Sequence, residues 1–352
     1  MKNNKRVLVV ATSSKTRGGI TAVINSYKNT KFWRDFNCVW IETHIDKSSI
    51  LKIVFFVRSL TKFILLLPQT SLVHIHLSAP MSAIRKLPFL FIAKMFKIPI
   101  IVHFHAFSAA SSIDKKHSKL YNIIFNTADT IIVLSKSWMS GLINDLGIDS
   151  KKIEVLYNPC PIINNVNNII KTDTILYAGT LIGRKGYKDL INSFAIISKS
   201  YPTWKLVFAG NGEIEEGIKL SKKLNIENQV IFSGWVSGVD KQKLFNEAKL
   251  FCLPSYAEGF PMAILDAWAY GLPVITTPVG GIPDVAKDGI NMLLFNPGDV
   301  DTLSKKLEIM ISNYELRNKI SDASLVFSLN EFSLNTIIKT LASIYKKHIN
   351  CK

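Results

Sequence analysis

Strand-like apolar runs alternate with helix-like amphipathic runs along nearly the whole chain, and this order most constrains the fold. In the first half, the runs that predict strands are 6–11, 37–41, 72–76, 98–105, 130–134 and 153–157. The alternation then restarts, with predicted strands at 174–178, 205–209, 229–232, 250–253 and 274–276, and a helical region at about 300–347. Strands that alternate with helices form parallel sheets with helices on both faces. The sequence therefore predicts an α/β protein with two doubly wound domains in series.

The interval between the two halves is the best candidate for a linker. Asn158-Pro159-Cys160-Pro161 is followed by an Asn-rich stretch to Asn168, a composition typical of a loop. The length of 352 residues agrees with two domains at about 150 residues each. We therefore expect domains at 1–165 and 166–330. Ligands of such sheets bind at the carboxyl ends of the strands.

The positive charge of the chain is unevenly distributed. The net charge is +17, and residues 1–165 hold 22 Lys+Arg against 8 Asp+Glu, a net of +14. Such asymmetry suggests an anionic partner for the first half, either nucleic acid or a membrane surface, with solubility as the alternative explanation. Hydrophobic residues make up 48% of the chain, which excludes a disordered protein.

Two apolar segments in the basic half carry several cations. Residues 50–67 read ILKIVFFVRSLTKFILLL, and residues 85–97 read RKLPFLFIAKMFK. Three cations in the first segment argue against a membrane-spanning helix and favour a helix lying on a membrane surface. The alternative is two buried domain helices whose cations extend to solvent. The surrounding charge favours membrane contact.

Neither the N-terminal apolar run nor the cysteine pattern indicates secretion. The apolar run at 7–11 has five residues, whereas a signal peptide needs about 7–15, so we interpret it as a buried strand. The four cysteines form no CxxC pair and no disulfide framework, which favours a reducing compartment.

Three glycine turns follow predicted strands and precede predicted helices, as in phosphate-binding loops. Gly18-Gly19 follows the first strand, residues 179–186 read GTLIGRKG, and Gly210-Asn211 lies in the turn AGNGE. Glycines let the backbone approach a phosphate, and Arg184 and Lys185 could neutralise a diphosphate. Each turn alone is weak, because a glycine turn or a pair of solvated charges is common without a ligand.

The stretch from Pro254 to Ala267 combines a strand end, an acidic loop and a helix start. Glu258 lies in the loop, Pro261 suits the first turn of a helix, and Asp266 follows Glu258 by eight residues. The helix N-terminus directs backbone donors toward the loop, as an anion site requires. The two carboxylates are thus predicted to approach one ligand.

Residues 258–285, EGFPMAILDAWAYGLPVITTPVGGIPDV, resemble the family 4 retaining glycosyltransferases of GT-B fold, whose hallmark is Glu, seven residues, Glu. The resemblance extends to the Gly-Gly, RKG and AGNGE turns and covers nearly the whole chain. It implies two Rossmann-like domains facing across a cleft, with a C-terminal helix at 331–352 that crosses back to the first domain. It also implies sugar transfer from a nucleotide-sugar with retention, without a metal or cofactor.

The resemblance assigns roles to individual residues. It implies that Glu258 contacts the hydroxyls of the donor sugar, that Asp266 binds ribose and that Lys185 binds the diphosphate. It also implies that His105 lies near the reacting sugar; the expected catalytic residues are His105, Glu258 and Lys185. The expected donor-binding residues are Gly18, Gly19, Arg184, Lys185, Gly210, Asn211, Glu258, Gly259, Phe260, Pro261 and Asp266.

Two departures from the family pattern affect these assignments. The second acid is Asp266, which is one methylene shorter than Glu and loses roughly 1.5 Å of reach, so it needs a nearer ribose or a bridging water. Thr180 stands where the family often has Arg, and Arg184 is the candidate to supply that charge.

The remaining histidines of the first half lie near predicted strand ends. His74 and His76 share one face of a strand, as do His103 and His105. No carboxylate or cysteine completes a ligand set with them, so we expect no metal site and interpret His74, His76 and His103 as acceptor-side or structural residues.

We therefore expect a metal-independent hexosyltransferase (EC 2.4) of cell-surface polysaccharide biosynthesis, with a UDP-sugar as the default donor and a glycan or lipid-linked acceptor. The pathway could be capsule, O-antigen or exopolysaccharide, at the cytoplasmic face of the cell membrane through the basic domain. Alternatives are a catalytically silent relative acting in a complex and a nucleic-acid-binding protein, although no stacking platform is visible. A soluble glycogen- or sucrose-type transferase is a further alternative.

Overall fold

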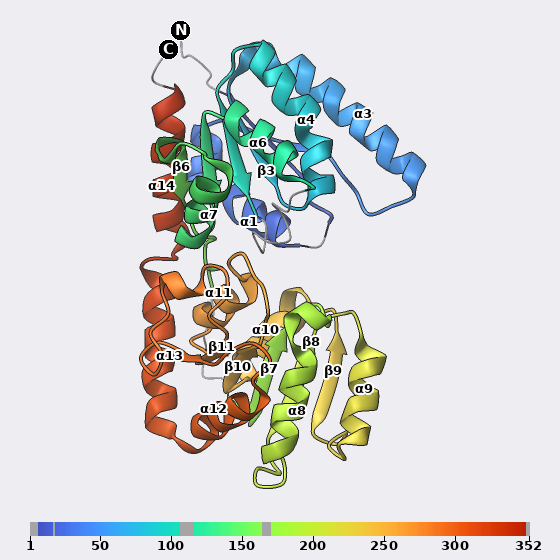
Figure 1. Cartoon of the computed structure of the whole chain (residues 1–352), viewed down its shortest axis with the longest axis vertical. Coiled ribbons are helices and arrows are strands. Elements are labelled where there is room, and N and C mark those ends of the chain that lie inside the picture. Colours follow the sequence, from blue (N-terminus) through green and yellow to red (C-terminus); the bar gives the residue numbers. More distant parts are fainter. Residues whose placement is uncertain (1–5, 17, 106–115, 164–169, 350–352) are drawn as a thin grey trace. The chain divides into compact units, whose positions relative to one another are not determined.

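The computed structural model describes residues 6–16, 18–105, 116–163 and 170–349, and the chain divides into two compact units (Figure 1). Unit 1 comprises Met1–Pro159 and Leu334–Lys352, and unit 2 comprises Cys160–Ser333. The division falls within the predicted linker, a few residues before the predicted boundary at 165. Residues 164–169 of that linker lie outside the described residues.

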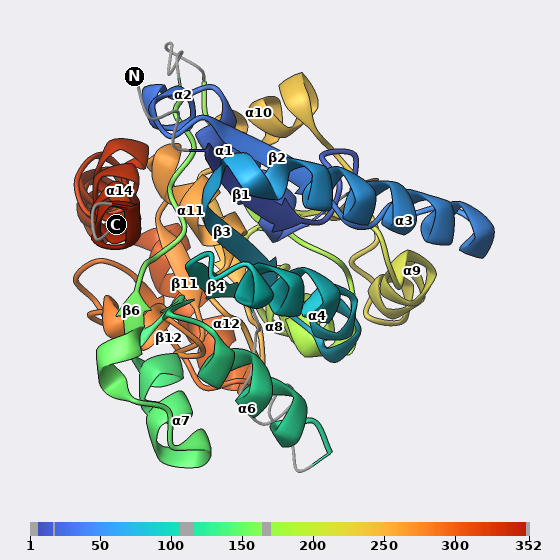
Figure 2. The ribbon, with the colours of Figure 1, turned by 90° about the horizontal axis from the view of Figure 1, so that it is seen from above.

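Unit 1 contains a six-stranded parallel sheet of order β2-β1-β3-β4-β5-β6 (Figure 2). The strands are β1 (Arg6–Ala11), β2 (Cys38–Glu42), β3 (Thr70–Leu77), β4 (Ile100–Phe104), β5 (Thr130–Val133) and β6 (Ile153–Val155). The helices are α1 (Gly19–Lys28), α2 (Lys31–Asp35), α3 (Ser49–Leu66), α4 (Pro80–Met95), α6 (Ser118–Thr127), α7 (Lys136–Leu146) and α14 (Leu334–Ile349).

Unit 2 contains a second six-stranded parallel sheet, of order β12-β11-β10-β7-β8-β9. The strands are β7 (Thr174–Ala178), β8 (Lys205–Ala209), β9 (Val230–Gly234), β10 (Leu250–Leu253), β11 (Val274–Thr276) and β12 (Leu293–Leu294). The helices are α8 (Tyr187–Ile197), α9 (Ile214–Lys223), α10 (Gly238–Glu247), α11 (Met262–Ala269), α12 (Val300–Ser312) and α13 (Tyr314–Leu329).

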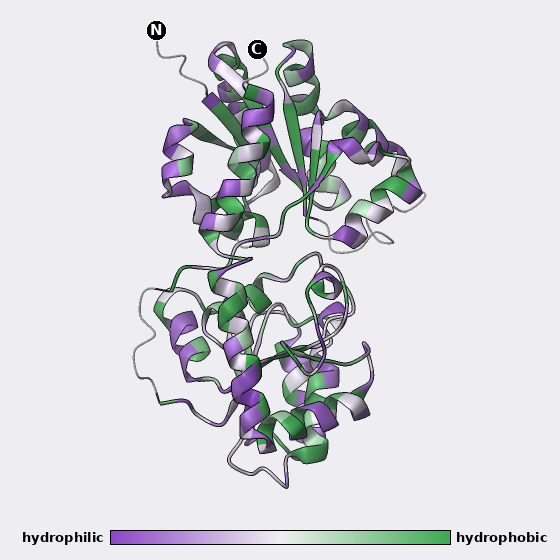
Figure 3. Ribbon diagram, turned by 90° about the vertical axis from the view of Figure 1, so that its left-hand side faces the viewer, coloured by the Kyte–Doolittle hydropathy of each residue, from purple (hydrophilic) through white to green (hydrophobic). Residues whose placement is uncertain are grey.

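The central strands are buried on both faces, which is why they read as continuous apolar runs. All residues of β4 and β10 are buried, and β1 is buried from Val7 to Ala11. Several strands of unit 1 carry the hydrophobic colour in Figure 3. Burial on both faces is the rule for parallel sheets covered by helices. The prediction of two parallel α/β domains is confirmed.

The C-terminal region is helical, as expected for 300–347. It forms three helices, because Asn313 ends α12 and its side chain accepts a hydrogen bond from Leu316 N at 2.9 Å to start α13. A further break precedes α14, which lies in unit 1 and contacts α1 and β3.

The two cationic apolar segments are helices α3 and α4, which lie against each other on the outside of unit 1 (Figures 1 and 2). On α3 only Ser59 and Phe63 are buried, and Phe63 packs on Phe89 of α4 at 5.1 Å between ring centroids. Helix α4 is buried more deeply than α3, and its Phe89 and Leu90 belong to the core of unit 1. In the part of the chain that the structure describes, no helix combines the length and the apolarity needed to span a bilayer.

Candidate active site

The RKG turn of unit 2 packs directly against the loop that follows β10. Gly186 has a left-handed conformation (φ 66°), and a Cβ at this position would come within 2.0 Å of the carbonyl oxygen of Pro254. Only glycine fits such an approach without displacing backbone. Tyr256 N also donates to the carbonyl oxygen of Arg184 at 2.8 Å. The sheet order places β7 beside β10, so both loops leave the same edge of the sheet.

Glu258 is the centre of the polar cluster at this edge. The residue is 6% exposed, and its Oε1 accepts hydrogen bonds from Lys185 Nζ and, at 2.6 Å, from Ser255 Oγ. Arg184 lies 3.9 Å from Oε2 and donates to the carbonyl oxygen of Ala257. A buried carboxylate is stable only when it is paired and hydrogen-bonded, and Glu258 is both.

The loop that carries Glu258 is held by its backbone as well. Gly281 N donates to the carbonyl oxygen of Gly259 at 2.7 Å. Gly280 (φ 61°) lies so close that a Cβ there would be 2.1 Å from the carbonyl oxygen of Glu258. The acidic loop is therefore fixed on both sides, by the RKG turn and by the glycine turn after β11.

Asp266 lies on α11, one turn before its end, and is 9% exposed. Burial raises the pKa of its carboxyl group, and the ammonium of Lys241, 2.6 Å away, opposes that shift. Lys241 belongs to α10 and remains more than a third exposed. The shorter acid is thus already paired with a cation that can itself meet a ligand.

The other expected donor-site residues of unit 2 have different structural roles. Gly210 lies against the carbonyl oxygen of Gly179, where a Cβ would be 1.8 Å away, and the side chain of Asn211 accepts from Trp235 N at 2.9 Å. Pro261 precedes the first residue of α11. Phe260 is 3% exposed and packs on Phe332, so its side chain belongs to the core rather than to the surface of the site.

In unit 1, Gly18 and Gly19 start α1 at the carboxyl end of β1. Both residues are exposed, and Gly18 has φ 153°. The preceding loop is tied to β2, because Glu42 accepts hydrogen bonds from Ser13 Oγ at 3.1 Å and Ser14 N at 2.5 Å. The turn has the exposed backbone that a phosphate-binding loop needs.

His105 follows β4 directly and is the only partly exposed member of a cluster of four histidines among the described residues of this sheet edge. Its Nε2 lies 2.9 Å from Nδ1 of His76, and its ring stacks on His103 at 4.0 Å between centroids. His74 completes the cluster, with Nδ1 2.7 Å from the hydroxyl of Tyr345 on α14. The sheet register pairs His76 with His103.

All four imidazoles are neutral at neutral pH. Burial lowers the pKa of His74 and His105 to about 3 and lowers those of His76 and His103 well below the usual value. Repulsion from neighbouring rings lowers the pKa of His74, His76 and His103 further. For His105 the additional lowering of the pKa comes from the charge of Lys86. The cluster therefore offers hydrogen bonds rather than charge.

Three of these histidines form the one group in the described ranges that could ligate a metal. Ring nitrogens of His74, His76 and His103 lie within 4.8 Å of one another. Nitrogen ligands of a tetrahedral zinc ion lie roughly 3.4 Å apart, and one nitrogen of His76 is already hydrogen-bonded. The rings would have to move closer to hold an ion, so we assign no metal site here.

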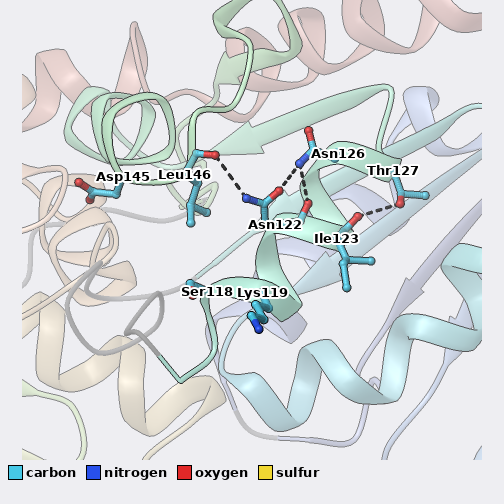
Figure 4. Close-up of a pocket in the computed structure, with 8 residues that line it drawn as sticks. All are labelled: Ser118, Lys119, Asn122, Ile123, Asn126, Thr127, Asp145 and Leu146. Carbon is cyan, nitrogen blue, oxygen red and sulfur yellow. Dashed lines mark hydrogen bonds between the residues drawn. The ribbon is translucent and has the colours of Figure 1, made fainter.

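A shallow hollow between α6 and α7 lies elsewhere on unit 1 and holds none of the expected site residues (Figure 4). Asn126 Nδ2 donates to the carbonyl oxygen of Asn122 at 3.0 Å, and Thr127 Oγ1 to that of Ile123 at 2.7 Å. Asn122 Nδ2 also donates to the carbonyl oxygen of Leu146 on α7 at 3.5 Å. We assign the hollow no function.

Sequence reasoning missed three residues that hold the expected site residues in place. Ser255 bonds Glu258, Lys241 bonds Asp266, and Tyr345 supports the histidine cluster. His76, expected as an acceptor-side or structural residue, bonds His105. Only Ser255, three residues before Glu258, is close in sequence to its partner. The other contacts join elements that are distant in sequence.

Comparison with known proteins identifies both units. Residues 9–162 match the family model "Glycosyltransferase Family 4", and residues 162–325 match "Glycosyl transferases group 1". The lipopolysaccharide 1,6-galactosyltransferase of Salmonella typhimurium is 35% identical over 180 residues, 47% of this chain and 48% of that protein. The capsular polysaccharide biosynthesis glycosyltransferase CapM of Staphylococcus aureus is 32% identical over 201 residues, 56% of this chain and 50% of that protein.

The matches span about half the length of most of these curated relatives. An uncharacterized 41.2 kDa protein in the cps region of Klebsiella pneumoniae is matched over its length, with 26% identity over 97% of this chain and 99% of that protein. Among solved structures, Anabaena Alr3699/HepE in complex with UDP has a TM-score of 0.81 at 17% identity, over 97% of this chain and 100% of that chain.

The two parallel sheets and the similarity to this solved structure define a GT-B fold with two Rossmann-like domains. The chain belongs to family 4 of the glycosyltransferases, as the resemblance of residues 258–285 predicted.

Proposed function

We propose that the protein is a retaining glycosyltransferase that moves a hexosyl group from a UDP-sugar to a glycan or lipid-linked acceptor in surface-polysaccharide synthesis. The observation that carries the proposal is the cluster at the edge of the unit 2 sheet. There Lys185, Ser255 and Arg184 surround the buried Glu258. A buried acid bonded to a lysine in a glycine-rich turn suits a ligand with sugar hydroxyls next to a diphosphate.

In this proposal the cations do the work that a metal does in other transferases. Lys185 and Arg184 stabilise the negative charge that develops on the departing diphosphate. Glu258 holds the hydroxyls of the sugar, and Asp266 with Lys241 holds the ribose. We assign no carboxylate as a covalent nucleophile, so we favour attack of the acceptor on the face that the diphosphate leaves.

The comparisons support the choice of donor and acceptor classes. Anabaena Alr3699/HepE was solved with UDP, UDP-glucose, and UDP and glucose, which favours a uridine donor. Two of the relatives are named as a lipopolysaccharide 1,6-galactosyltransferase and a capsular polysaccharide biosynthesis glycosyltransferase, which favours a bacterial surface glycan as product.

A thermal-shift screen of UDP-, GDP- and ADP-sugars tests the donor. A ligand that binds the folded protein alone raises the melting temperature with its concentration. We expect a shift with UDP-sugars that EDTA does not abolish, followed by transfer to an acceptor extract with the anomeric configuration kept. A shift with GDP-sugars alone would mean that the donor nucleotide is GDP rather than UDP. Loss of the shift in EDTA would contradict metal independence. Binding without any transfer or hydrolysis would favour a silent relative.

We also propose that helix α3 docks unit 1 on the inner face of the cell membrane. Its outward side carries large hydrophobic residues that are 43–75% exposed: Ile50, Leu51, Ile53, Val54, Val57, Ile64 and Leu65. Arg58 and Lys62 are exposed on the same helix, and no acidic residue occurs between Asp46 and Asp114. Apolar side chains next to cations, without acids, suit an anionic lipid surface.

Flotation with vesicles of anionic or neutral phospholipid tests this docking. We expect the protein to float with anionic vesicles, and the Arg58→Glu/Lys62→Glu variant to bind them much more weakly. The matched control is Lys222→Glu/Lys223→Glu, which changes the charge equally on exposed residues of α9. Equal loss in both variants would mean that net charge alone drives binding. Retention on DNA but not on vesicles would favour the nucleic-acid alternative.

A further inference from the structure

His76 is the residue that connects the expected catalytic histidine to the interior of unit 1. It lies on β3, is 1% exposed, and its Nδ1 is 2.9 Å from Nε2 of His105. The rings of His74 and His103 pack against it at 4.2 and 4.9 Å between centroids. This packing leaves the imidazole of His76 little freedom to turn away from His105.

The contact between the two rings decides which nitrogen of His105 is offered to a ligand. Nε2 of His105 is engaged by His76, so Nδ1 is the ring nitrogen that remains for a substrate at this partly exposed position. In a neutral imidazole one nitrogen carries the proton, and the hydrogen bond made by the other nitrogen fixes which one. The bond to His76 therefore controls whether Nδ1 of His105 donates or accepts.

We propose that His76 is a positioning residue that fixes the orientation and the tautomer of His105 toward the transferred sugar. The inference rests on the proposed function, because it takes His105 as a group that meets the sugar. His76 itself touches no substrate in this arrangement. It acts through one hydrogen bond in which one ring donates and the other accepts, so the tautomer of His105 follows that of His76.

The histidine pair is held from behind by the C-terminal helix. Nδ1 of His74 lies 2.7 Å from the hydroxyl of Tyr345 on α14, which fixes the ring that packs on His76. Tyr345 is itself buried between Phe32 and Phe36, each 5.2 Å away between ring centroids. The ring of His76 is thus set by three elements of unit 1: β3, β4 and α14.

Two substitutions of His76 separate the hydrogen bond from the packing. In His76→Asn the side chain keeps a polar group near the place of Nδ1, whereas His76→Leu fills the space without one. We expect His76→Leu to lower kcat by about 10- to 100-fold, the range seen when a residue that orients a catalytic ligand is lost, with little change in UDP affinity. His76→Asn should recover part of the rate.

His103→Leu is the matched control. His103 is as buried as His76, pairs with His76 in the sheet register and stacks on His105. Among the described residues, however, His103 makes no hydrogen bond to His105. We expect this variant to lower kcat by much less than His76→Leu does, because it removes ring packing but no hydrogen bond to His105. A fall equal to that of His76→Leu would show that packing, not the hydrogen bond, matters.

A double-mutant cycle with His105→Ala completes the test. If His76 acts only through His105, His76→Leu has no further effect on the rate of His105→Ala. An equal further loss in that background would overturn the proposal and leave His76 a structural residue.

Long-range ¹⁵N–¹H spectra of protein labelled at histidine test the inference even if no transfer is detected. We expect a single tautomer for His105 in the parent and in His76→Asn, and a mixture in His76→Leu. Identical His105 signals in all three would refute the inference, whereas a silent parent enzyme with the expected spectra would refute only the proposed function.

Discussion

The two units present opposite chemistry at their sheet edges. In unit 2 the expected site residues are charged and paired, with Lys185 on Glu258 and Lys241 on Asp266. In unit 1 the corresponding edge holds neutral imidazoles, although this half of the chain carries most of the positive charge. The basic character of unit 1 therefore lies on its surface helices, not in its histidine cluster.

This difference teaches how the two halves of a transferase divide the work. A diphosphate needs fixed cations, and buried acids keep those cations in place before the ligand arrives. A sugar is uncharged, and neutral groups with a defined tautomer recognise it through directional hydrogen bonds. The comparison predicts that variants that remove a charge in unit 2 lower the transferase activity most.

The largest effect is expected at Glu258. Glu258→Gln keeps the volume but removes the charge that pairs with Lys185, and it weakens the acceptor for sugar hydroxyls. We expect kcat/KM to fall roughly 10²- to 10³-fold, a loss comparable to removal of one preorganised electrostatic group. Steady-state transfer kinetics measure it. The control Glu216→Gln removes an exposed acid of α9 that pairs with the neighbouring Lys219, and near-equal losses would remove Glu258 from the site.

The second effect concerns the coupling between Lys185 and Glu258. Lys185→Met should weaken UDP binding and lower the rate, because the diphosphate loses a cation and Glu258 loses its partner. Since the two side chains form one ion pair, we expect the Lys185→Met/Glu258→Gln double variant to lose less than the sum of the single losses. Calorimetric UDP titrations and kinetics on the same four proteins measure the coupling. Strict additivity would show that the pair does not act as a unit.

A smaller effect is expected at Asp266. Asp266→Asn leaves Lys241 without its acid, and the ribose would lose a charged acceptor. We expect UDP to bind about tenfold more weakly, with inhibition by inorganic pyrophosphate unchanged, because only UDP carries the ribose. If both ligands weaken equally, Asp266 acts through Lys241 on the phosphates instead.

The sequence predicted what is local and failed on what is distant. The turn that holds Lys185 and the loop that holds Glu258 were predicted from their glycines and proline, since local backbone geometry demands those residues. The partners Lys241 and Tyr345 come from helices far along the chain, and no local pattern marks which side chain will reach Asp266 or His74. Phe260 was expected to meet the donor, but its motif position could not reveal that its ring packs on Phe332.

The smallest effect, and the one specific to unit 1, is the response of stability to acid. Burial lowers the pKa of the four histidines below that of the unfolded chain, so the unfolded state binds more protons at acid pH. The histidine contribution to the free energy of unfolding should be complete above about pH 6.5 and fall progressively toward pH 3. The buried Lys86, whose pKa burial lowers from 10.5 to about 7, makes its loss at higher pH, between about 10.5 and 7, and so does not steepen this acid response.

His103→Leu isolates one of these histidines. Both ring nitrogens of His103 are buried and have no hydrogen-bond partner among the described residues, so the leucine removes polar atoms that gain nothing from folding. The variant takes up one proton fewer on unfolding, and the slope of unfolding free energy against pH should decrease by up to about 1.4 kcal/mol per pH unit. Urea titrations at pH 7, 6 and 5 measure this slope. An unchanged slope would mean that His103 is charged or solvated in the native state, and the contrast between a neutral unit 1 edge and a charged unit 2 edge would then be wrong.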